Sequence, residues 1–174
     1  MPQKPSFVGV PPLLDAPEYD LGEDEIKLEV PGYRQMDGYS CDPVDAWSVL
    51  QTFHPSKSFR RFYQDCKVTD DGTNEYQIIR ALRKNGVGIS VRDEMEFDDI
   101  VKTIDEGFPI LTSIRLSGYI DHWVCIYGVG LNPPRLFTCN HGGTTCHGRA
   151  EIAWGDWMKL WDDSSHYLIC WGKL

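Results

Sequence analysis

The sequence predicts a single domain of the α+β class, in which N-terminal helices pack on a C-terminal antiparallel sheet. Three observations predict it. The chain has 174 residues, of which 41% are hydrophobic, and this suits one domain with a substantial core. Apolar residues recur at helical spacing as far as Glu106. After Gly107, short β-rich runs are separated by glycine, asparagine and proline.

The N-terminal segment, residues 1–25, is proline-rich, acidic and without periodicity, which is typical of an arm packed along the domain or of a flexible tail. Residues 26–174 form the expected domain. The first residues lack the apolar run of a secretory signal, and no stretch approaches the roughly 20 apolar residues of a membrane span. A cytoplasmic protein without membrane contact is therefore expected.

The first helix is expected to begin at Cys41. Ser40 is a suitable N-cap, and Pro43 fits the first turn, where its missing N–H costs nothing. Apolar residues then recur at near-helical spacing: Val44, Trp47, Val49 and Leu50. Cys41 therefore lies at the N-terminus of a helix.

Two further helices and a series of strands follow. The helices are expected at Asn74 to Asn85, stopped by Gly86, and at Phe97 to Glu106, ended by Gly107 and Pro109. A short helical turn is expected around Trp154 to Trp161. The β-rich runs are Ile110 to Arg115, His122 to Val129, Arg135 to Asn140 and Tyr167 to Trp171.

The charge and the cysteines restrict the function. The formal net charge is −9, with no cluster of lysine or arginine, so nucleic acid is not an expected partner, whereas a cationic substrate or a peptide with a basic tail is favoured. The chain has six cysteines. Cys125, Cys139 and Cys170 lie in apolar runs, where a free cysteine packs like a small hydrophobic residue, and no structural disulfide is expected.

Cys41 has the position that thiol chemistry requires. The nucleophilic form of cysteine is the thiolate, which the dipole and the free N–H groups of a helix N-terminus stabilise. The alternative is a buried cysteine that only packs.

Three more residues have the types and the order of a cysteine-hydrolase site. His122, at the head of an apolar strand, is a candidate base, or else a core histidine bonded to a backbone carbonyl. Gln35 is a candidate oxyanion donor, or else an exposed loop residue. Asn140 is a candidate to orient the imidazole, or else a turn asparagine. The order glutamine, cysteine, histidine, asparagine favours all four together.

The run Val30 to Pro43, with the sequence VPGYRQMDGYSCDP, resembles the active-site segment of the bacteriocin-processing cysteine peptidases, a papain-like family. Gly72-Thr73-Asn74 before a helix, and Phe97 to Pro109 before a strand and Asp121-His122-Trp123-Val124, are also similar to that family. The resemblance spans residues 30 to 172. It implies a papain-like fold without a cofactor or metal, and these roles: Gln35 the oxyanion residue, Cys41 the nucleophile, His122 the base and Asn140 the orienting residue.

Two positions depart from the family. Members usually carry glycine after the cysteine, where this chain has Asp42, and a carboxylate beside a thiolate raises the pKa of the cysteine. The third residue of the triad is commonly aspartate in the family, whereas here it is Asn140, as in papain. The best-known members are fused to an export transporter and cut leader peptides after two glycines. The chain encodes no transporter, so that substrate is not assumed.

A group of metal-binding residue types lies beside Asn140. It favours a structural zinc site as an alternative use of these residues, but the spacing matches no established ligand pattern, and no metal is expected. The group is Cys139, His141, Cys146 and His147.

The sequence thus predicts a cysteine hydrolase that cleaves a peptide or amide bond through a Cys-His-Asn triad and a thioester intermediate. Two alternatives remain. One is acyl transfer or deamidation on the same triad. The other is a catalytically silent papain-like module that binds a peptide, which Asp42 favours. The expected partner in each is a peptide or protein, and the sequence leaves the cleavage site and the oligomeric state open.

Overall fold

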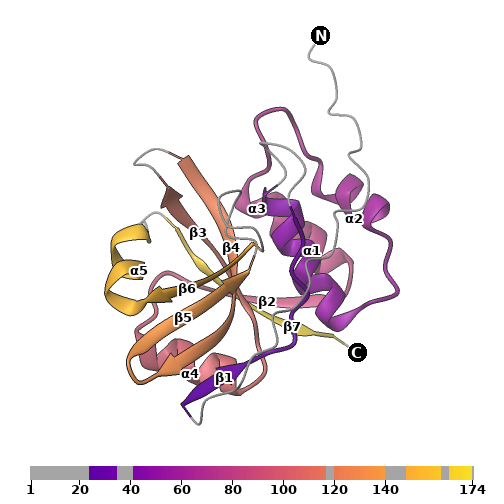
Figure 1. Cartoon of the computed structure of the whole chain (residues 1–174). Coiled ribbons are helices and arrows are strands. Elements are labelled where there is room, and N and C mark those ends of the chain that lie inside the picture. Colours follow the sequence, from indigo (N-terminus) through magenta and orange to yellow (C-terminus); the bar gives the residue numbers. More distant parts are fainter. Residues whose placement is uncertain (1–23, 35–40, 117–119, 140–147, 162–164, 174) are drawn as a thin grey trace.

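The computed structural model describes residues 24–34, 41–116, 120–139, 148–161 and 165–173. These ranges contain seven strands, which form a single antiparallel sheet (Figure 1). Of the arm expected at residues 1–25, only Asp24 and Glu25 are among them. The strands are β1 (Glu25–Lys27), β2 (Val87–Arg92), β3 (Ile110–Leu116), β4 (Ile120–Leu131), β5 (Pro134–Cys139), β6 (Arg149–Ala153) and β7 (Tyr167–Gly172).

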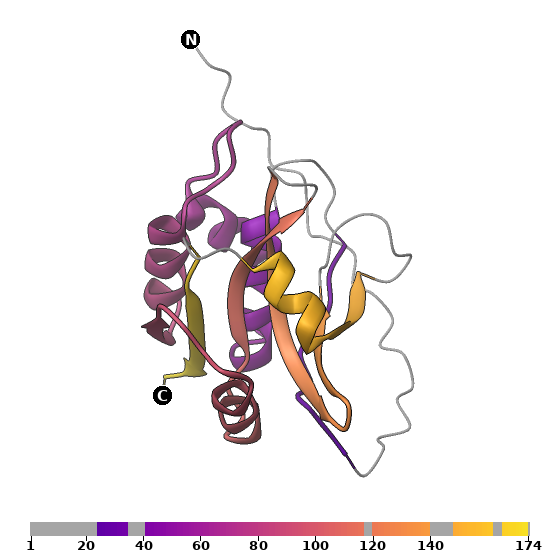
Figure 2. The ribbon, with the colours of Figure 1, turned by 90° about the vertical axis from the view of Figure 1, so that its left-hand side faces the viewer.

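The strand order is β2-β7-β3-β4-β5-β6, and β1 adds to β4. The helices of the same ranges cover both faces of the sheet (Figures 1 and 2). They are α1 (Cys41–Phe53), α2 (Phe59–Cys66), α3 (Glu75–Lys84), α4 (Phe97–Asp105) and α5 (Trp154–Leu160). Helices α1 to α3 share one apolar core with the sheet, and α4 and α5 share a second. No helix in this part of the chain is long and apolar enough to cross a membrane.

Strand β4 contributes side chains to both cores. Trp123 and Cys125 belong to the core under α1, whereas Val124 and Ile126 belong to the core under α4. Successive side chains of a strand point to opposite faces, so a strand between two helical layers needs an apolar residue at nearly every position. This explains the continuous apolar run that follows His122.

The helix boundaries agree closely with the sequence. Helix α1 begins at Cys41, as predicted, while its expected cap, Ser40, lies outside the described residues. Helix α3 begins one residue later than predicted because Asn74 is its N-cap. The Asn74 side chain accepts from the Gln77 N–H at 2.9 Å, and the Gln77 side chain accepts from the Asn74 N–H at 2.8 Å. The helix gives way to Gly86, whose φ of +95° favours glycine.

The predicted order of helices first and strands afterwards is incomplete, because four elements were not predicted: β1, α2, β2 and β6. Strand β2 lies between α3 and α4 in sequence but pairs with β7, at the other end of the chain. Gly88 permits this pairing, because a Cβ at that position would lie 2.2 Å from the Trp171 indole. The predicted fold class is nevertheless confirmed.

Candidate active site

The start of α1 lies against the edge of β4. The backbone N–H of Trp123, in β4, donates to the Cys41 sulfur. Among the described residues, β5 pairs with β4 only from Cys125 onward. The N-terminus of α1 thus reaches the sheet immediately beside His122.

His122 lies in β4, opposite Ile114 of β3, and is 7% exposed. A protonated His122 would lower the pKa of the Asp42 carboxyl, which immediately follows Cys41. The structure therefore brings Cys41 and His122 to the same end of β4, and their catalytic roles stay predictions.

The buried carboxylate of Asp42 is held from two sides. Asp42 is 5% exposed. The Cys41 thiol donates to Oδ1 with Sγ 2.8 Å away, and the Thr73 hydroxyl donates to Oδ2 at 2.6 Å. Thr73 immediately precedes Asn74, the N-cap of α3, so the capped start of α3 delivers this hydroxyl to the first turn of α1.

These contacts keep the thiol protonated. Burial raises the pKa of the Cys41 thiol, the Asp42 carboxylate raises it further, and the N–H of Trp123 opposes them. Burial also raises the pKa of Asp42, although the thiol and the Thr73 hydroxyl stabilise its ionised form. The predicted effect of Asp42 on Cys41 is confirmed in direction. The expectation that the helix N-terminus favours a thiolate is outweighed, because the half-buried thiol lies beside a carboxylate.

Two predicted site residues, Gln35 and Asn140, lie outside the described residues, but the segments that lead to both are well fixed. Before Gln35, Nη2 of Arg149 donates to the carbonyl of Val30 at 2.9 Å. The Arg149 guanidinium also lies 4.7 Å from the centre of the Tyr127 ring. Before Asn140, Cys139 pairs with Cys125 of β4, three residues beyond His122.

Of the residues considered for the alternative zinc site, His141, Cys146 and His147 lie outside the described residues, and Cys139 is fully buried. Among the described residues, no three histidine, cysteine or acidic side chains form a metal-binding group. The five cysteines in these ranges are all unbridged: Cys41, Cys66, Cys125, Cys139 and Cys170.

Sequence reasoning missed Thr73 as a member of this site. The residue is part of the Gly72-Thr73-Asn74 run, whose resemblance to the family indicates only the start of a helix. A hydroxyl before a helix cap is common, and its partner, Asp42, is thirty-one residues earlier in the chain. Only the packing of α3 against α1 reveals the contact.

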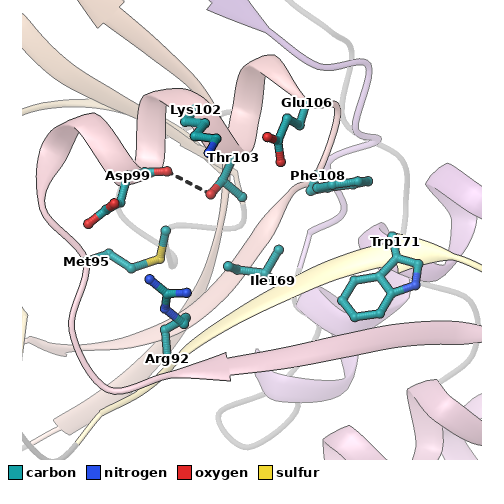
Figure 3. A pocket seen from close by; sticks show the side chains of 9 residues that line it. All are labelled: Arg92, Met95, Asp99, Lys102, Thr103, Glu106, Phe108, Ile169 and Trp171. Atoms are coloured by element: carbon teal, nitrogen blue, oxygen red, sulfur yellow. Dashed lines mark hydrogen bonds between the residues drawn. The ribbon is translucent and has the colours of Figure 1, made fainter.

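A cavity of about 250 Å³ lies elsewhere, between α4 and the β2–β7 edge of the sheet (Figure 3). Ile169, in its wall, belongs to the core under α4, so the cavity faces away from α1 and Cys41. Its walls carry both charges as well as apolar groups and are formed by Arg92, Met95, Asp99, Lys102, Thr103, Glu106, Phe108, Ile169 and Trp171.

The sequence matches no protein-family model and no curated protein. Similar solved structures include three peptidase domains. The peptidase domain of Streptococcus ComA, a bifunctional ABC transporter of a quorum-sensing pathway, is 15% identical with a TM-score of 0.63, over 81% of this chain and 96% of that one. A double glycine motif protease from an AMS/PCAT transporter, in complex with the leader peptide, is 19% identical with a TM-score of 0.66, over 84% and 94%.

The peptidase domain of Streptococcus mutans ComA is 14% identical with a TM-score of 0.59, over 80% of this chain and 98% of that one. At such identities the similarity concerns the fold. The helices packed on an antiparallel sheet, with Cys41 opening the first helix and His122 in the central strand, are thus the papain-like fold that this chain shares with double-glycine peptidase domains.

Proposed function

We propose that the protein is a cysteine peptidase that cleaves a peptide or amide bond, with Cys41 as the nucleophile and His122 as the base. One observation carries the proposal: Cys41 opens α1, and its sulfur contacts the backbone of Trp123, the residue that follows His122 in β4, in a fold shared with peptidase domains. Gln35 and the Cys41 backbone N–H are the proposed oxyanion donors, and Asn140 the residue that orients the imidazole.

The proposed reaction forms a thioester on Cys41 and then hydrolyses it. The His122 imidazole takes the proton of the Cys41 thiol, and the thiolate attacks the scissile carbonyl carbon. Gln35 and the Cys41 N–H donate to the oxyanion. When the oxyanion collapses, the carbon–nitrogen bond breaks and His122 gives its proton to the leaving amine. Water, deprotonated by His122, then attacks the thioester and releases the acid and the free thiol.

The proposed substrate is a peptide with a basic segment. The net charge of −9 attracts such a segment. One structural neighbour was solved with its leader peptide bound, which supports a peptide as the ligand of this fold.

A silent peptide-binding module is the second candidate, and the hydrogen bond from the Cys41 thiol to Asp42 favours it. A thiol that stays protonated at neutral pH is a weak nucleophile. Under this alternative the protein keeps the fold and binds a peptide but does not cleave it.

The test is mass spectrometry of a basic peptide panel, including a peptide with two adjacent glycines, after incubation with the protein. Two shorter products are expected, and both should disappear in Cys41→Ala and His122→Ala with unchanged circular dichroism. Cys170→Ala, which removes a buried thiol of β7, is the matched control and should retain cleavage. A conjugate indicates acyl transfer, a small mass gain indicates deamidation, and binding without products indicates the silent module. Cleavage that survives in Cys41→Ala would refute the proposal.

A further inference from the structure

We propose that Asp42 is a positioning residue which holds Cys41 in its thiol form in the free protein, and that Thr73 fixes the Asp42 carboxylate for this task. This inference rests on the proposed function of Cys41 as the nucleophile. It adds a resting state of the same site, in which Cys41 is a protonated thiol and not a nucleophilic thiolate.

The geometry of the carboxylate supports the assignment. Asp42 directly follows Cys41 at the start of α1, and each of its oxygens accepts one hydrogen bond, from the thiol at 2.8 Å and from the Thr73 hydroxyl at 2.6 Å. Ionisation of the thiol would break the first bond and leave two negative charges in contact. Because Asp42 is 5% exposed, water screens this repulsion poorly.

The charged and titratable groups around Asp42 come from several elements. They are Cys41 and Asp45 of α1, Cys66 of α2 and His122 of β4. His122 becomes positively charged when it takes a proton, while Asp45 adds to the negative charge that opposes a thiolate. The thiol proton thus has two acceptors: it is shared with Asp42 at rest, and it passes to His122 when the thiolate forms.

Thr73 gives the carboxylate a fixed orientation. Its hydroxyl binds Oδ2, which leaves Oδ1 directed at the thiol. The capping box formed by Asn74 and Gln77 immediately after Thr73 fixes its backbone. Removal of the hydroxyl leaves the carboxylate with its own backbone N–H and the thiol as donors, and without the contact that orients it, so it should hold the thiol proton less strongly.

The test is the rate of alkylation of Cys41 by iodoacetamide between about pH 5 and pH 10, measured by peptide mass spectrometry. In the wild type the midpoint should lie above the ordinary cysteine value of about 8.5. Asp42→Asn removes the charge and should lower the midpoint by at least one unit, so that alkylation at neutral pH becomes about tenfold faster or more. Asp71→Asn, which removes an exposed carboxylate near Thr73, is the matched control and should follow the wild type.

A second pair of variants keeps the test decisive if Asp42→Asn fails to fold. Thr73→Val at this half-buried position should move the midpoint to lower pH, in the direction of Asp42→Asn, and Thr73→Ser should restore it. The inference is overturned if the profiles of the Asp42 and Thr73 variants superimpose on that of the wild type, or if the wild-type midpoint lies below the ordinary value. Alkylation needs no substrate. A shifted profile without peptide cleavage therefore refutes the proposed function alone, and cleavage with unshifted profiles refutes the role of Asp42 alone.

Discussion

The Cys41 thiol and the Asp42 carboxylate form a hydrogen bond, with 2.8 Å between Sγ and Oδ1. The consequence of this hydrogen bond is electrostatic. The carboxylate counteracts the stabilisation that a helix N-terminus offers to a thiolate. The proposed nucleophile is therefore protonated at neutral pH, and the activity of the protein should depend on pH accordingly.

Peptide cleavage should increase with pH into the alkaline range. The pKa of Cys41 is raised by burial and by Asp42, so the fraction of thiolate grows only above the ordinary cysteine value of about 8.5. The measurement is kcat/KM across pH with a cleaved peptide, in the wild type and in Asp42→Asn. The Asp42→Asn profile should rise at lower pH. A wild-type profile that is already flat at acidic pH would contradict the raised pKa.

Buried thiols should make the fold less stable at alkaline pH. The pKa is raised by burial for the Cys41 and Cys66 thiols, and to about 12 for the Cys170 thiol. Hydrogen bonding with Cys139 and burial also raise the pKa of Cys125. Because each folded pKa exceeds the unfolded value, the stabilisation is complete below about pH 8.5 and is lost as the pH rises toward the folded pKa.

The free energy of unfolding should therefore fall by about 1.4 kcal/mol per pH unit for each such thiol above pH 8.5. Urea unfolding at a series of alkaline pH values measures this slope. Cys170→Ala removes one of the thiols and should make the slope shallower by one thiol's share. Equal slopes in the wild type and in Cys170→Ala would show that the folded state does not hold this proton.

Gly88→Ala should destabilise the β2–β7 edge of the sheet. The added Cβ would lie 2.2 Å from the Trp171 indole, so the ring must move out of the wall of the α4 cavity. Overpacking of this kind costs about 1–3 kcal/mol, measurable by urea unfolding. Trp171→Ala in the same chain should remove most of the clash. Gly155→Ala is the matched control, since nothing lies within 4 Å of the added Cβ, and it should leave the stability unchanged or improve it.

Arg149→Ala should reduce the kcat of peptide cleavage even under conditions in which the variant stays folded. Arg149 binds the carbonyl of Val30 and covers Tyr127, and so fixes the segment that leads to Gln35. Loss of the bond should cost about 1–3 kcal/mol of stability and should reduce kcat at temperatures where the variant is folded. Arg92→Ala, at an exposed arginine beside the α4 cavity, should retain kcat. Equal kcat values in Arg149→Ala and Arg92→Ala would show that Arg149 does not support the active site.

The sequence predicts those elements whose signals are local. The apolar spacing behind Cys41, the cap at Asn74 and the stop at Gly86 predict α1 and α3 to within one residue. Helix α2 has an apolar stripe with helical spacing, but it is short and interrupted by Arg60 and Arg61. Strand β2 contains a glycine and gains its stability from distant β7, and no local pattern reveals such pairing.

The site also combines features that have a local sequence signal with features that arise only from packing. Residue type and order predict Cys41 and His122, and adjacency alone predicts that Asp42 raises the pKa of Cys41. The larger cause, burial of the sulfur against β4, depends on how α1 packs and has no signal in the segment itself. The contact between Asp42 and Thr73 likewise arises only once α3 packs against α1.

The most direct test of the account is covalent capture of the nucleophile by a basic peptide that ends in a vinyl sulfone. Such a group reacts with a thiolate positioned beside a proton donor. Intact-mass measurement and peptide mapping should find one adduct, on Cys41, formed much more slowly in His122→Ala. An adduct on another cysteine, or the same rate on Cys41 without the imidazole, would contradict a Cys41–His122 peptidase.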